Sequence, residues 1–164
     1  MPRVDNNINL VPSVLDRLLD DQPGVSCEPA SDRLQDLAGL KKAIARDVEA
    51  LLNTRQEILD ELAPEFTEVR RSILVYGLPD FTSMSQRSDR DRGRMRQAVE
   101  QAIGLFEPRL TRVRVTLEPP RAHDQALRFR IEALLRVEPA PEPVTFDASL
   151  QMDTQAYAVR DATR

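Results

Sequence analysis

Carboxylates are the side chains of this 164-residue chain that could carry out acid–base chemistry. Glu107 lies in the segment Glu107-Pro108-Arg109 and could act as a general acid. Cleavage of a glycosidic bond commonly needs two carboxylates about 5–10 Å apart. Asp80 or Glu132 could supply the second one, but nothing in the spacing selects either. We therefore favour an ion pair in which Glu107 binds Arg109 or another arginine and fixes a corner, or a role in binding a partner.

Histidine and cysteine add little to a chemical site. The single histidine, His123, lies beside Asp124 in a proline-rich stretch without a serine or cysteine signature, and we expect an exposed loop residue. Cys27 is the only cysteine, which excludes an intramolecular disulfide and a thiolate metal cluster. It has no basic neighbour close in sequence that would activate it. The sequence predicts no metal and no cofactor.

The distribution of arginine is the remaining indication of a binding surface. Residues 1–82 carry 9 Lys or Arg against 15 Asp or Glu, whereas residues 83–164 carry 14 against 12, and all of those 14 are Arg. Aromatic residues make up only 4% of the chain and Trp is absent, so we expect no nucleic-acid partner. A solvated face remains an alternative, because runs of charge are usually that. We predict instead a protein-docking face, since arginines on neighbouring strands repel one another and an acidic partner would relieve this. Its residues are Arg112, Arg114, Arg128 and Arg130, near an arginine run at positions 87, 90, 92, 94 and 96.

The elements that must position these side chains follow from hydrophobic periodicity. Apolar residues step by three and four over 31–52, which predicts the longest helix, and a weaker pattern over 56–76 could be a short helix. Ser88 with Asp91 resembles a capping box for a basic amphipathic helix. That helix should stop at Leu105 or Phe106, because Pro108 disfavours helical backbone at the residue before it. A short amphipathic segment at residues 14–19 is too short to be stable alone and should dock on something.

Alternation of apolar and polar residues predicts three strands, near residues 112–117, 127–137 and 144–152. Consecutive strands with short connections favour an antiparallel meander. The predicted fold class is α+β, with N-terminal helices followed by the basic amphipathic helix and a small three-stranded antiparallel sheet. We expect a flexible N-terminal segment with a short docking helix at 1–30, one α+β domain at 31–152 and a frayed tail at 153–164.

We expect neither a membrane-spanning segment nor an export signal in this sequence. No apolar run approaches the roughly 20 residues that a membrane-spanning helix needs. The first residues contain neither a basic n-region nor an apolar h-region. We therefore expect a cytoplasmic location without direct membrane insertion.

Four segments together closely resemble the TssE family, the type VI secretion baseplate subunits related to the small wedge subunit of contractile-phage baseplates. They are Ser13–Leu18, Leu51–Arg55, Tyr76–Asp80 and Glu107–Leu110, and they occur in the family's order. The resemblance implies a structural, non-enzymatic role beside the TssF and TssG subunits, at a surface from which the TssB and TssC sheath polymerises. It also implies partner-binding roles for Glu107, Pro108 and Arg109 and for Leu52, Asn53, Thr54 and Arg55.

An edge strand of the predicted sheet could accept a strand from another chain, which would be a natural way to start a sheath. Two other functions remain open at this point. One is a lysozyme-like cell-wall hydrolase that uses Glu107, and the other is an RNA-binding module.

Overall fold

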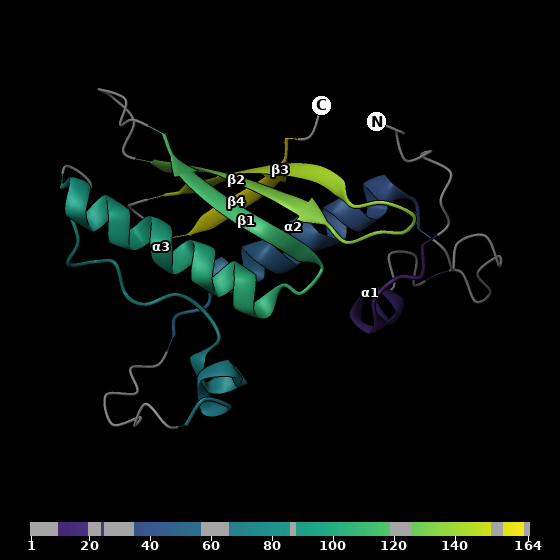
Figure 1. Ribbon diagram of the computed structural model, residues 1–164, viewed down its shortest axis with the longest axis horizontal. Helices are drawn as coiled ribbons and strands as arrows, with labels where there is room; N and C mark the ends of the chain where they lie inside the picture. Colours follow the sequence, from purple (N-terminus) through teal and green to yellow (C-terminus); the bar gives the residue numbers. More distant parts are fainter. Residues whose placement is uncertain are drawn as a thin grey trace. The chain divides into compact units, whose positions relative to one another are not determined.

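The computed structural model describes residues 10–19, 24, 35–56, 66–85, 88–118, 126–151 and 156–162 (Figure 1). The chain divides into two compact units, residues 1–44 and 45–164. Its α-helices are α1 (Val14–Leu18), α2 (Leu37–Asn53) and α3 (Asp89–Phe106), with two 3-10 turns, η2 (Val69–Arg71) and η3 (Ile73–Val75). Its strands are β1 (Leu110–Leu117), β2 (Leu127–Leu135), β3 (Glu142–Leu150) and β4 (Tyr157–Asp161).

The short helix α1 in the first unit is held by its own cap. The Ser13 hydroxyl accepts a hydrogen bond from the Asp16 backbone N–H at 3.1 Å, and the Asp16 carboxylate accepts one from the Ser13 N–H at 3.2 Å. Val14 is 74% exposed and Leu18 76% exposed. The segment is therefore helical as predicted, with apolar side chains that face solvent in the structure.

Helix α2 starts later than predicted. The predicted start at Ser31 and Asp32 lies outside the described residues, but Gln35, which the prediction placed inside the helix, forms a two-way backbone bridge with Leu10. A residue that pairs in this extended manner cannot belong to the helix. Asp36 instead caps the start, because its Oδ1 accepts a hydrogen bond from the Gly39 N–H at 2.7 Å.

The basic helix α3 and its end agree with the sequence. Ser88 caps it by accepting a hydrogen bond from the Asp91 N–H at 3.3 Å, while the Asp91 carboxylate accepts one from the Ser85 N–H at 3.1 Å rather than closing a capping box. The last turn closes with a hydrogen bond from the Glu107 N–H to the Ile103 carbonyl at 2.9 Å. The helix ends at Phe106, as predicted from Pro108.

The sheet has four antiparallel strands in the order β1-β2-β3-β4 (Figure 1). The prediction of three strands was therefore one short, and the predicted tail at 153–164 was wrong where Tyr157–Asp161 pairs with β3. The alternation predicted for β2 and β3 is confirmed. One face is buried, formed by Leu127, Phe129, Ile131, Ala133 and Leu135 on β2 and by Val144, Phe146, Ala148 and Leu150 on β3.

Strand β1 is not regular. Thr111 pairs with Leu134 and Arg114 pairs with Glu132, so two residues of β1 face the single residue between those partners. Arg112 accommodates this bulge with a φ of 53°, in the left-handed region that a residue with a Cβ rarely adopts. The bulge interrupts the alternation that the sequence predicts for this strand.

The connection between α2 and α3 is fixed by a glycine. Residues 69–75 form two 3-10 turns rather than the short helix considered above, while residues 57–65 lie outside the described part. Gly77 has a φ of +110°, and a Cβ there would collide with the carbonyl of Thr54. This close approach lets Arg55 and Leu78 pair as an isolated parallel bridge.

Candidate protein-binding site

The corner between α3 and β1 holds an ion-pair network. The Arg109 guanidinium donates from Nε to Glu107 Oε1 at 2.7 Å and from Nη2 to the other oxygen of the same carboxylate. The Arg109 backbone N–H also donates to Glu107 Oε1 at 3.2 Å. This bidentate pair matches the ion pair favoured from the sequence, and it fixes the direction in which the chain leaves α3.

A third partner comes from α2. Arg109 Nη2 also donates to Asp47 Oδ2 at 2.6 Å, although 62 residues separate the two in sequence. Asp47 in turn accepts hydrogen bonds from Arg46 Nε at 3.0 Å and Nη2 at 2.7 Å through its other oxygen. The network therefore ties α2 to the corner as well as ordering the corner itself.

Electrostatics at the corner follow from this geometry. The hydrogen bond that Arg109 donates to Glu107 raises the pKa of the guanidinium; partial burial opposes this increase, and the hydrogen bond donated to Asp47 adds to it. Tyr76 packs edge-to-face on Phe106 with ring centroids 5.1 Å apart. Burial, and then the charges of Asp47 and Glu107, raise the pKa of the Tyr76 hydroxyl. Arg109 therefore stays charged and the Tyr76 hydroxyl stays neutral at neutral pH.

Glu107 is poorly placed for acid catalysis. The residue is 4% exposed, and both of its carboxylate oxygens accept hydrogen bonds from Arg109. A general acid needs a proton to donate and access to the bond that it cleaves. Asp80 is exposed and bound elsewhere, to the Thr82 N–H at 2.9 Å, and Glu132 lies on the exposed face of β2.

A second cluster joins the end of α2 to β4. The Asn53 side chain donates to the Tyr157 carbonyl at 2.9 Å and accepts from the Tyr157 N–H at 2.8 Å, as a neighbouring strand would. It also donates to the Glu49 carbonyl at 2.9 Å, and the Glu49 carboxylate accepts from the Val159 N–H at 2.8 Å. Two side chains of α2 thus bind the outer backbone of β4.

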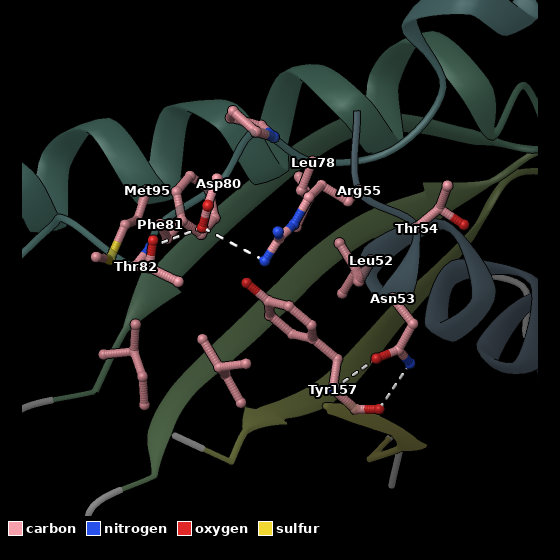
Figure 2. Close-up of a pocket in the computed structure, with 13 residues that line it drawn as sticks. Leu52, Asn53, Thr54, Arg55, Leu78, Asp80, Phe81, Thr82, Met95 and Tyr157 are labelled. Carbon is pink, nitrogen blue, oxygen red and sulfur yellow. Dashed lines mark hydrogen bonds and ion pairs between the residues drawn. The ribbon is translucent and has the colours of Figure 1, made fainter. Parts of the chain in front are cut away.

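The Leu52–Arg55 segment lines a cavity of about 140 Å³ with the 78–82 segment (Figure 2). Thr54 donates its hydroxyl proton to the Ala50 carbonyl at 2.8 Å, so it also has a local structural role. Arg55 pairs with Asp80 at 3.7 Å, and hydrogen bonds from Thr82 lower the pKa of Asp80. The buried part of the cavity lining consists of Leu52, Leu78, Met95, Leu127, Leu150 and Tyr157.

The two outer strands of the sheet both carry side-chain hydrogen bonds on their backbone. On β1 the Glu100 carboxylate of α3 accepts from the Val115 N–H at 2.8 Å, and Arg96 holds the same carboxylate at 3.1 Å. On β4 the partners are Asn53 and Glu49. A partner strand that added to either edge would have to displace these side chains.

The four arginines predicted as a docking face are distributed over β1 and β2. Arg114 lies opposite Glu132 in the register, while Arg130 contacts Asp147 at 3.1 Å and Glu118 at 3.7 Å. The remaining two are Arg112, at the bulge, and Arg128, which lies opposite Ser149. The repulsion expected from the sequence is thus relieved partly within the chain, and Asp147 raises the pKa of Arg130.

The structure brings only some of the predicted site residues together. Glu107, Pro108 and Arg109 form one cluster, and the Leu52–Arg55 segment forms a second that contacts β4. Asp47, Glu49 and Glu100 were missed, because no local pattern marks a helical carboxylate that binds a distant backbone or guanidinium. Tyr157 was missed together with its strand, β4. His123 and Cys27 lie outside the described residues.

The described part of the chain contains neither a metal-binding cluster of side chains nor a helix suited to a membrane. Within those ranges no group of three or more His, Cys, Asp or Glu side chains could hold a metal ion. None of the helices placed there is both long and apolar enough to cross a membrane.

The fold and the site define a small α+β domain built around a fixed helix-to-strand corner, with side chains of two helices bound along the edges of its sheet. A family profile described as "Baseplate wedge protein gp25" matches residues 38–140. Because the match covers more than half of the chain, the chain belongs to this family. It is the family of TssE, so the resemblance seen in the four sequence segments is confirmed. A search of curated proteins found no match. Family membership supports a structural role in a contractile baseplate, of phage or type VI secretion kind.

Proposed function

We propose that this chain is a TssE-like baseplate subunit of a type VI secretion system, acting at the cytoplasmic side of the inner membrane. Its partners would be the baseplate subunits TssF and TssG and the first ring of the TssB and TssC sheath. The match of residues 38–140 to the baseplate wedge family carries the proposal, because this range contains both the corner and the end of α2.

The corner is the first contact that we assign to a baseplate partner. Pro108 is exposed at its tip, and the Arg109 side chain is 27% exposed. Glu107 is buried, so its role would be to hold Arg109 in position and not to touch a partner. A proline-restricted turn with an immobilised arginine loses little conformational entropy on binding, which favours its use as a contact.

The end of α2 is the second contact, and its residues have different roles. Leu52 is buried, and Asn53 and Thr54 are engaged in hydrogen bonds within the chain. Arg55, by contrast, has a side chain that is 63% exposed. We therefore assign a direct contact to Arg55 and structural roles to the three residues before it.

The outer face of the sheet is the third contact. We propose that an acidic partner surface binds Arg112, Arg114, Arg128 and Arg130, although the ion pairs of Arg130 reduce the charge that this face offers. The charge-reversing pair Arg112→Glu and Arg128→Glu should weaken assembly. Normal assembly of that double variant would remove this face from the proposal.

We propose that the chain has no hydrolase activity, because both oxygens of Glu107 are bound by Arg109. The check is a peptidoglycan turnover assay on the wild type and on Glu107→Gln. Turnover by the wild type that disappears in Glu107→Gln would establish the cell-wall hydrolase instead.

Co-purification with TssF, TssG and the sheath subunits tests the proposal as a whole. The wild type should be recovered in the complex, and Arg109→Ala should be depleted at a temperature where circular dichroism shows that it is folded. Arg94→Ala is the matched control, since Arg94 is an exposed arginine of α3 away from the corner. Failure of the wild type to co-purify would contradict the assignment, and intact assembly of Arg109→Ala would contradict the role of the corner.

A further inference from the structure

The cavity of about 140 Å³ beside the end of α2 combines a buried, largely apolar lining with an exposed, polar rim. All of its lining residues belong to the second unit of the chain. The buried ones come from α2, α3, β2, β3, β4 and the 78–82 segment, and they are Leu52, Leu78, Met95, Leu127, Leu150 and Tyr157. An apolar cavity of about 150 Å³ holds a benzene molecule. This cavity is therefore large enough for one leucine or phenylalanine side chain.

One polar atom of the buried lining is left unpaired. Tyr157 is 7% exposed, and its hydroxyl has no hydrogen-bond partner among the described residues. Figure 2 shows the ring extending from β4 with its hydroxyl directed toward Arg55. Burial raises the pKa of this hydroxyl, so it stays protonated at neutral pH and can donate. Because a buried donor without an acceptor costs stability, a ligand that brings an acceptor to this point gains affinity.

The charged groups of the rim balance each other. The Arg55 and Asp80 side chains, 63% and 38% exposed, pair at 3.7 Å. Hydrogen bonds from Thr82 lower the pKa of Asp80, so its carboxylate stays ionised at neutral pH. A balanced pair gives little preference for an ionic ligand, but beside the Tyr157 donor it offers an acceptor to a neutral dipolar group. The peptide group is such a group, because its N–H donates and its carbonyl accepts.

The rim can open without movement of the backbone. Arg55, Asp80 and Thr82 are all exposed. Exposed side chains change rotamer within picoseconds to nanoseconds, so entry of a ligand beside Tyr157 is not limited by the rim.

We propose that this cavity is an anchor pocket for one phenylalanine or leucine residue of a partner polypeptide. The apolar side chain fills the buried lining, the Tyr157 hydroxyl donates to a peptide carbonyl of the anchor, and the Asp80 carboxylate accepts from a neighbouring peptide N–H. The anchor contacts side chains of the pocket and adds no strand to the sheet. Assignment of the partner to the baseplate rests on the proposed function, in which Arg55 is a contact. The pocket itself does not depend on it.

The probe is N-acetyl-L-phenylalaninamide, which carries one aromatic side chain between two peptide groups. It is titrated into the ¹⁵N-labelled full-length chain, and binding is followed by amide chemical shifts in NMR spectra. A ligand of this size should bind with a dissociation constant of about 1 mM. The shifts should cluster at residues 52–55, 78–82 and 157, which surround the cavity. N-acetyl-L-alaninamide has the same peptide groups without the ring, and it should cause no shifts there at about 10 mM.

A pair of tyrosine variants makes the test specific. Tyr157→Phe keeps the ring and removes the hydroxyl, so it should weaken binding of the probe about fivefold. Tyr76→Phe is the matched control and should leave binding unchanged, because the Tyr76 ring packs on Phe106 and does not line the cavity. Toluene, which has no peptide group, should bind Tyr157→Phe at least as tightly as the wild type. Binding of toluene also shows that the cavity of the variant is intact.

Three results would overturn the pocket. They are no binding of the probe to the wild type at about 10 mM, equal affinity of the wild type and Tyr157→Phe, and an equal loss in Tyr76→Phe. Toluene that binds where the probe does not would show that the cavity takes free apolar molecules and no peptide.

The source of the anchor is tested by co-purification with TssF and TssG in the presence of the probe. At about ten times its dissociation constant the probe should weaken the complex by up to about tenfold, and N-acetyl-L-alaninamide should have no effect. Unchanged recovery with the probe bound would remove the baseplate partner from this pocket. If the wild type co-purifies and the probe does not bind, the baseplate assignment stands and only the pocket is lost.

Discussion

Replacement of Arg109 by alanine is the sharpest test of the corner. The change leaves the Glu107 carboxylate, whose side chain is 6% exposed, without its cation, and removes the link to Asp47. Breaking a buried ion pair by removing one partner costs about 3–5 kcal/mol. Because the Asp47 side chain is 23% exposed, water can replace part of what is lost there. We expect a decrease in the free energy of unfolding of about 3 kcal/mol, and a Tm lower by about 10 °C.

Urea unfolding followed by far-UV circular dichroism measures this loss directly. Arg94→Ala is again the control, because an exposed arginine in mid-helix should change the free energy of unfolding by less than about 0.5 kcal/mol. A double-mutant cycle with Asp47→Asn isolates the contact between α2 and the corner. Since both groups share one network, the coupling energy should be about 1–2 kcal/mol.

Two results would refute this reasoning. If Arg109→Ala unfolds within about 0.5 kcal/mol of the wild type at an unchanged m value, the ion pair does not hold the corner. If the losses in Arg109→Ala and Asp47→Asn simply add, the two residues act independently and the network does not join α2 to β1.

Three further outcomes follow from backbone and burial. Gly77→Ala should lower the free energy of unfolding by about 3 kcal/mol, because the new Cβ collides with the Thr54 carbonyl and the backbone φ is positive. Gly93→Ala should raise it by about 0.5–1 kcal/mol, because Gly93 lies inside a helix and its new Cβ meets nothing within 4 Å. Urea unfolding compares the two variants. Tyr157→Phe removes the unpartnered hydroxyl and should leave stability unchanged or raise it by about 1 kcal/mol, and a loss above 1 kcal/mol would reveal a missing partner. Burial raises the folded-state pKa of the Tyr157 hydroxyl above its ordinary value of 10.0, so its contribution to stability is fully present below pH 10 and is lost as the pH rises through the folded-state pKa. Absorbance at 295 nm should accordingly show Tyr157 ionising above pH 10 and together with unfolding, and titration near pH 10 in the folded state would contradict its burial.

The sequence predicted the elements whose signals are local. Helix α3 ends where Pro108 requires, and β2 and β3 lie where apolar residues alternate over nine positions. The pair formed by Glu107 and Arg109 was also predictable, since the two are only two residues apart. The four segments that indicated the family are local signals of the same kind.

Two elements escaped prediction because their local signals were weak or misleading. β4 has only Tyr157 and Val159 as buried apolar positions, too few for an alternation to stand out. The start of α2 was set too early, since residues before Leu37 continue the apolar spacing while Gln35 is drawn into a bridge with Leu10. In both cases pairing of the backbone with a distant segment decided the structure, with little local signal for β4 and against the local signal at Gln35.

What the chain alone determined is therefore its helices, its two central strands, the proline-limited corner and the family to which it belongs. Only the tertiary structure decided what binds to them. Asp47 reaches Arg109 across 62 residues, and Asn53 reaches Tyr157 across 104. Periodicity reports which face of an element is buried, but it contains no information on which distant polar group that face will meet. The folded chain supplies that partner, and with it the fixed arginine of the corner and the side-chain bonds that hold β4.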